Sequence, residues 1–150
     1  MTATSAQTVE ITVERTIPAL PGEVFDAWLD PKVPGTLWHG HDKLIFDPRV
    51  DALWYLQTFV HRPDGTPHFG RFMEIDRPHR LQHSWMSRNT LGEETVVTVT
   101  FEKRGTGTVM TLKHSGLPND AAAEPHRKGW NSIFDRFGGL FVGNPRKGTR

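Results

Sequence analysis

The 150-residue chain contains no cysteine. This absence excludes disulfide frameworks, catalytic thiols and cysteine-ligated zinc or iron–sulfur sites. The chain also lacks an excess of charge, because its 18 basic and 17 acidic side chains leave a net charge of +1. So small a charge creates no long-range attraction to a polyanion, and a nucleic-acid partner is not expected.

No stretch of the sequence is apolar over the length needed to cross a bilayer, so we expect no membrane span. The opening residues 1–7 are small and polar, without the basic start and apolar run of a signal peptide. Together these two absences predict a cytoplasmic protein.

Five Trp and nine Phe supply apolar area in large pieces, although only 36% of the residues are hydrophobic. A chain of this length can bury a core as one domain, without disulfides, metals or a partner. We therefore predict a single domain over residues 1–150, with flexible ends at 1–7 and 142–150.

Periodicity divides the chain into an opening strand, a β-rich middle and a helical tail. Alternating apolar and polar residues predict strands, and the turn residues between them predict antiparallel pairing. The predicted strands cover residues 8–17, 44–46, 52–61, 68–75, 80–87, 94–103 and 108–114. Helical spacing predicts a short helix over 23–29. Pro34-Gly35 limit the second short helix, over 36–41, to one turn or a structured loop.

The predicted C-terminal helix begins near Pro118 and carries one apolar stripe. The stripe consists of Trp130, Ile133, Phe134, Phe137, Leu140 and Phe141. Pro125 is expected to bend or restart this helix, and Gly138-Gly139 to loosen its end. The predicted fold class is α+β: a curved antiparallel sheet of six to seven strands wrapped around the long helix, with two short helices after the first strand.

Turn lengths predict which residues pair across the sheet. A turn at Arg77-Pro78 places Glu74 opposite Leu81, Phe72 opposite His83 and Gly70 opposite Trp85, where Gly70 would leave room for the indole. A two-residue turn at Gly105-Thr106 places Phe101 opposite Met110, Val99 opposite Leu112 and Val97 opposite His114. This register gathers the apolar side chains on one inner face.

Glu74, His83 and His114 are the polar exceptions on that predicted face. Buried polar groups need partners or solvent, and two interpretations stay open. The three groups are hydrogen-bonded at the margin of a full core, which the spacing favours, or they orient a ligand in a cavity. If a reaction occurs there, His83 or His114 is the candidate acid or base, and Glu74 is the residue that orients it.

A ligand between the sheet and the C-terminal helix is predicted to contact aromatic and apolar side chains from both. These residues are Trp28, Trp38, Trp54, Phe72, His83, Trp85, Val99, Phe101, Met110, Leu112, Trp130, Phe134 and Phe137. No cofactor is expected, because no glycine-rich loop follows a strand and opens a helix. No metal is expected either, since the spacing of His39 and His41 suits no usual zinc site.

Three groups of residues, in order along nearly the whole chain, carry a family resemblance. They are 13–19 with 23–28 and Asp30-Pro31; 70–76 with Arg80-Leu81 and Ser84-Trp85; and 107–112 with 114–117 and Gly129-Trp130. In these motifs the chain resembles the activator-of-heat-shock-protein-ATPase-like branch of the START or helix-grip superfamily, which is also called SRPBCC or birch-pollen-allergen-like. One departure is that Leu37-Trp38-His39-Gly40 stands where the family commonly ends a helix in Trp-Trp-Gly.

The resemblance implies a helix gripped by a curved sheet around a cavity that takes lipids, polyketides or other apolar molecules in related proteins. Binding of such a small molecule is therefore the leading expectation. A cyclase or hydrolase that uses cavity His and Glu residues is one alternative. The other is an interaction module, either co-chaperone-like or a homodimer that uses exposed Leu53, Tyr55 and Phe59. The branch has no invariant catalytic set to transfer.

Overall fold

The computed structural model describes residues 7–60, 62–63 and 65–142. The flexible ends expected at 1–7 and 142–150 lie outside the described residues, except for Gln7 and Val142. In chain order the elements are β1 (Val9–Ile17), α1 (Pro21–Trp28), β2 (Lys43–Ile45), β3 (Leu53–Gln57), β4 (His68–Asp76), β5 (Arg80–Ser87), the 3-10 turn η1 (Arg88–Thr90), β6 (Thr95–Arg104), β7 (Gly107–Leu117) and α2 (Asp120–Val142).

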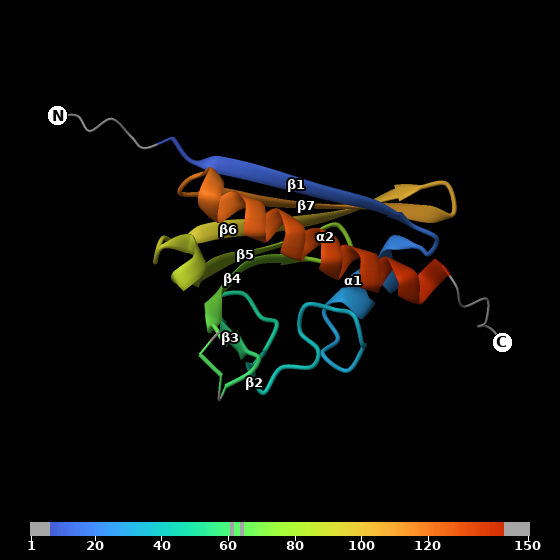
Figure 1. Ribbon diagram of the computed structural model, residues 1–150. Helices are drawn as coiled ribbons and strands as arrows, with labels where there is room; N and C mark the ends of the chain where they lie inside the picture. Colours follow the sequence, from blue (N-terminus) through green and yellow to red (C-terminus); the bar gives the residue numbers. More distant parts are fainter. Residues whose placement is uncertain (1–6, 61, 64, 143–150) are drawn as a thin grey trace.

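Seven antiparallel strands form one sheet in the order β1-β7-β6-β5-β4-β3-β2. The long helix α2 crosses one face of this sheet, and α1 lies near the C-terminal end of α2 (Figure 1). The predicted α+β class, with a sheet gripping a C-terminal helix, is confirmed. No helix among the described residues has the length and apolarity needed to cross a membrane.

Only one of the two short helices expected after β1 is present. Pro21 occupies the first turn of α1, where its missing N–H costs no helical hydrogen bond. The segment 36–41, expected to be one helical turn or a structured loop, is a structured loop that follows turns closed by hydrogen bonds from Val33 N to Asp30 O and from Thr36 N to Val33 O. Gly35 takes a φ of 98°, which a continuing helix cannot accommodate.

The β6–β7 pairing follows the predicted register, with Phe101 opposite Met110, Val99 opposite Leu112 and Val97 opposite His114. The short turn and the strict alternation of apolar residues leave this hairpin no competing register, because a shift of one residue would expose its apolar side chains.

The β4–β5 pairing agrees with the prediction at Phe72 and His83 but not at Glu74. A bulge between Phe72 and Glu74 places Glu74 opposite Gln82, and Ile75 takes the position opposite Leu81. Glu74 therefore lies on the other face, where its carboxylate pairs with Arg80 at 2.8 Å.

Gly70 serves a different purpose from the one predicted. A Cβ atom at Gly70 would overlap the Ser84 carbonyl oxygen, so the glycine permits close approach of the β4 and β5 backbones. The backbone of Ser84, and not the Trp85 indole, is therefore what requires a glycine at position 70.

The apolar stripe of α2 packs on the sheet as predicted. Trp130, Phe134 and Phe137 are buried, and Trp28 of α1 makes edge-to-face contacts with both phenylalanines at centroid distances of 5.7 and 5.2 Å. The helix does not restart at Pro125, and it continues through Gly138-Gly139 to Val142. The sheet and α2 thus enclose a closely packed aromatic core.

Candidate functional site

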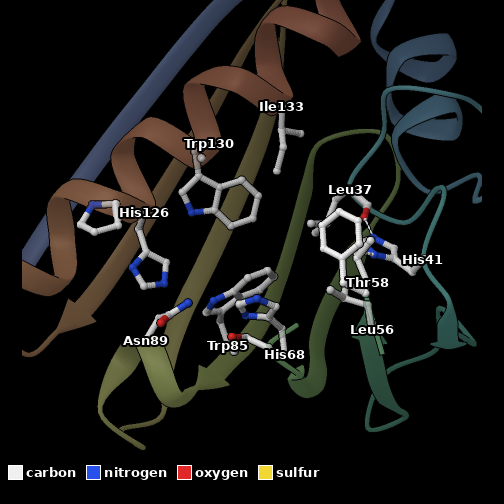
Figure 2. Close-up of a pocket in the computed structure, with 14 residues that line it drawn as sticks. Leu37, His41, Leu56, Thr58, His68, Trp85, Asn89, His126, Trp130 and Ile133 are labelled. Carbon is white, nitrogen blue, oxygen red and sulfur yellow. Dashed lines mark hydrogen bonds between the residues drawn. The ribbon is translucent and has the colours of Figure 1, made fainter. Parts of the chain in front are cut away.

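A cavity of about 340 Å³, partly open to solvent, lies between the N-terminal half of α2 and the β3–β5 side of the sheet (Figure 2). Its volume falls in the range of small-molecule sites. The lining residues are Leu37, His41, Leu56, Thr58, Phe59, Thr66, His68, Trp85, Asn89, Pro125, His126, Gly129, Trp130 and Ile133. The cavity is therefore built from α2, three strands and the segments that join them.

Helix α2 supplies two rows of lining residues at four-residue spacing, which places them on one side of a helix. Pro125, Gly129 and Ile133 form one row, and His126 and Trp130 form the second. Gly129 adds no side chain, and a Cβ atom built there would meet no atom within 4 Å. The cavity is therefore open along this part of the helix.

Aromatic rings form the floor of the cavity. The Trp85 ring lies 5.1 Å from the Trp130 ring and 5.0 Å from the His68 ring, measured between centroids. Leu37 and Leu56 contribute the opposite apolar wall (Figure 2). Such surfaces suit a flat apolar or aromatic molecule.

Hydrogen bonds of His41 fix the loop that contains Leu37. Its Nε2 donates to the Leu37 carbonyl oxygen at 2.5 Å, so in the neutral ring Nδ1 accepts from the Thr58 hydroxyl at 2.7 Å. Both nitrogens are therefore engaged, and the turn after α1 is tied to the chain that follows β3.

Three buried polar atoms of cavity-lining residues have no hydrogen-bond partner in the part of the chain that the structure describes. They are Nδ1 of His68, Nε1 of Trp85 and Nε2 of His126. Burial, together with the nearby His126 and His41, lowers the pKa of His68 to about 4. His68 is therefore uncharged at neutral pH.

His114 lies behind the cavity and links α2 to the sheet. The Trp130 indole N–H donates to His114 Nδ1 at 3.0 Å, so Nε2 of the neutral ring carries the proton and donates to Thr95 Oγ1 at 2.7 Å. The Thr95 hydroxyl then donates to the Trp85 carbonyl oxygen. Burial, reinforced by His126 and His83, lowers the pKa of His114 to about 3.

Of the thirteen predicted ligand-contacting residues, Trp85 and Trp130 line this cavity. The remaining eleven belong to the packed interior: Trp28, Trp38, Trp54, Phe72, His83, Val99, Phe101, Met110, Leu112, Phe134 and Phe137. Contact of these eleven with a ligand stays a prediction. The cavity itself is lined by residues of α2, of β3–β5 and of the connecting segments.

The three catalytic candidates are not brought together as one acid–base group. Glu74 is paired with Arg80 on the other face of the sheet. His83 is fully buried among Trp38, Trp54 and Phe72, with Nδ1 donating to the Ser84 carbonyl oxygen. Both nitrogens of His114 are engaged. The expected orientation of a histidine by Glu74 is therefore wrong.

Sequence reasoning missed His41, His68 and His126 as cavity residues. They come from a loop, a strand and a helix, so no local spacing connects them. The one available signal was the four-residue interval between His126 and Trp130 on α2, together with the absence of a side chain at Gly129.

Comparisons with known proteins agree with the architecture. The family model described as "Activator of Hsp90 ATPase homolog 1-like protein" matches residues 18–141. No curated protein matches the chain.

Several solved structures share the fold at low sequence identity. Mll3558 of Rhizobium loti is 20% identical with a TM-score of 0.72, over 89% of this chain and 96% of that one. CalU16 of Micromonospora echinospora is 22% identical with a TM-score of 0.68, over 89% of this chain and 76% of that one. DynU16, from the dynemicin biosynthetic locus, is 24% identical with a TM-score of 0.71, over 91% of this chain and 48% of that one.

Proposed function

The chain belongs to the Activator of Hsp90 ATPase homolog 1-like family, within the START or helix-grip superfamily, and from this premise we propose that it binds a small apolar or aromatic molecule in the cavity beneath α2. The observation that carries the proposal is a cavity of about 340 Å³ with aromatic walls, on whose lining residues three buried polar atoms find no partner among the described residues. One similar structure, DynU16, is a putative protein in the dynemicin biosynthetic locus, which supports a polyketide-like or lipid-like ligand.

Purified protein should be stabilised by members of a library of small aromatic and lipid-like compounds. A ligand at about 100 times its Kd should raise Tm by about 5–10 °C, because it binds the folded state alone. Native mass spectrometry of freshly purified protein would weigh any molecule that is retained. If no compound shifts Tm and no molecule is retained, ligand binding is not the function.

Filling the cavity from α2 should weaken this binding. Gly129→Phe places a ring where the structure leaves open space, and it should weaken ligand affinity by about 10-fold or more. Gly139→Phe is the matched control, since it lies on the same helix, also meets no atom within 4 Å at Cβ, and is absent from the cavity lining. Equal affinities in the two variants, measured by isothermal titration calorimetry, would place the ligand elsewhere.

Homodimerisation is a second candidate, favoured by apolar side chains on the outer face of β2, β3 and β4. Ile45, Tyr55 and Phe69 are neighbours in register, and Ile45 and Phe69 are 60% and 40% exposed. Light scattering should then give twice the 17.0 kDa chain mass, and Phe69→Arg should restore the monomer. A monomeric wild-type protein at high concentration excludes this role.

A chaperone partner and a cytoplasmic location complete the proposal. The family description, which names the Hsp90 ATPase, is what supports the partner. Affinity capture with purified Hsp90 tests the partner, and cell fractionation tests the location.

A further inference from the structure

A contact within α2 decides which nitrogen of the neutral His126 ring carries the hydrogen. Nδ1 of His126 lies 2.7 Å from the Ala122 carbonyl oxygen, which can only accept a hydrogen bond, so Nδ1 carries the proton. In the neutral ring Nε2 is therefore a lone-pair acceptor. This atom is buried and has no partner in the described part of the chain, and the whole residue is only 8% exposed.

Trp85 presents the complementary group. Its indole Nε1 can only donate, is buried without a partner among the described residues, and belongs to a side chain that is 5% exposed. Figure 2 shows the His126 ring directed from α2 toward Trp85, with Asn89 beside them. One donor and one acceptor, each without a partner in the described parts of the chain, thus lie on the same side of the cavity.

Few chemical groups satisfy both atoms at once. A hydroxyl accepts from the Trp85 N–H through its oxygen and donates its proton to His126 Nε2. A carbonyl or an ether accepts from Trp85 but leaves the His126 lone pair unpaired, which carries a desolvation penalty. A carboxylate has no proton to donate and would direct negative charge at the lone pair of the neutral His126 ring.

We propose that the ligand is a hydroxylated aromatic, such as a phenol, whose hydroxyl group bridges Trp85 and His126 while its rings lie against Trp130 and Ile133. The inference rests on the proposed ligand-binding function and specifies the chemical class of the ligand. Both bridging atoms are covered in this structure, so the hydroxyl reaches them through a side-chain adjustment of the kind that commonly accompanies binding.

Three probes of one shape test the proposal: 2-naphthol, which donates and accepts, 2-methoxynaphthalene, which only accepts, and naphthalene, which does neither. Isothermal titration calorimetry at neutral pH measures each Kd. We expect 2-naphthol to bind about 10-fold more tightly than either other probe, because one or two net hydrogen bonds separate them.

Substitutions at His126 and Trp85 test whether these two side chains cause the preference for 2-naphthol. His126→Phe and Trp85→Phe each keep a ring and remove the polar atom, so the preference for 2-naphthol should fall to about 1–3-fold in either. Ile133→Ala is the matched control, because it removes an apolar lining side chain and should weaken all three probes alike. Circular dichroism and Tm verify that each variant is folded, and either ring variant suffices if the other does not fold.

The outcomes distinguish a failure of the hydroxyl proposal from a failure of ligand binding itself. Equal affinity of the three probes for wild-type protein overturns the hydroxyl proposal and leaves ligand binding in place. A preference that survives in the folded ring variants also overturns it. Binding of none of the probes overturns this inference, and ligand binding itself falls only if the broad library and native mass spectrometry also give nothing.

Discussion

Lowering the pH from about 7.5 to about 4.5 should reduce the free energy of unfolding by on the order of 5 kcal/mol. The main cause is the burial of uncharged His83 and His114, both 0% exposed, and the less deeply buried His68 adds to it. Burial lowers the pKa of His83 to about 4 and that of His114 to about 3. In the unfolded chain both rings return to an ordinary pKa of about 6.5.

Acidification lowers the free energy of unfolding because the unfolded chain binds more protons than the folded protein. Between about pH 6.5 and the folded-state pKa values, the unfolded chain takes up protons that the folded protein excludes, so acidification favours unfolding. Stability is complete above about pH 6.5 and is lost as pH falls toward 4. The Asp26–Arg77 ion pair lowers the pKa of Asp26 from an ordinary 3.8, so its contribution is lost only at still lower pH.

Urea unfolding at a series of pH values measures this loss. His83→Phe removes one of three titrating rings, the others being His68 and His114, and should reduce the pH dependence by about a third. His79→Gln, which changes an exposed ring, is the control and should leave the dependence unaltered. A free energy that stays constant from pH 7.5 to 5 would mean that the buried rings accept protons within the folded protein.

Trp38→Ala should lower the free energy of unfolding by about 3–5 kcal/mol, the usual cost of removing a large buried aromatic side chain. Trp38 is 0% exposed, and its ring lies 4.6 Å from Phe46, 5.3 Å from Trp54 and 5.7 Å from Phe72 between centroids. This one ring anchors the turns between α1 and β2 to the core.

The same substitution should weaken ligand binding, because Leu37 and His41 of this segment line the cavity. Denaturant unfolding measures the first effect and calorimetry the second. Leu53→Ala, at a side chain that is 69% exposed, is the control and should change stability by less than about 0.5 kcal/mol. A loss below about 1 kcal/mol for Trp38→Ala would contradict the observed packing.

Much of the fold follows from local patterns. Alternation along 94–103 and 108–114 and the short turn at Gly105-Thr106 left one register that buries the apolar side chains, and the structure has that register. The apolar stripe of α2 likewise required a sheet to cover it. The restart expected at Pro125 does not occur, because a single proline does not divide a helix that tertiary packing holds along its length.

The site was far less predictable from local patterns. The bulge between Phe72 and Glu74 adds one unpaired residue, and this single residue moves Glu74 from the expected inner face to the outer one. Aromatic richness predicted large apolar surfaces, but not which of them would fill the core. Trp38 and Trp54 pack against each other, whereas Trp85 and Trp130 also border open space.

The sequence by itself determined the strand order along the chain, the amphipathic helix and the absence of cysteine chemistry, because each depends on residue type and short-range spacing. Only the tertiary structure decided where the cavity lies and that His41, His68 and His126 all line it. A cavity is the volume that packed side chains leave unfilled, so it depends on the relative placement of distant elements, which no local periodicity specifies.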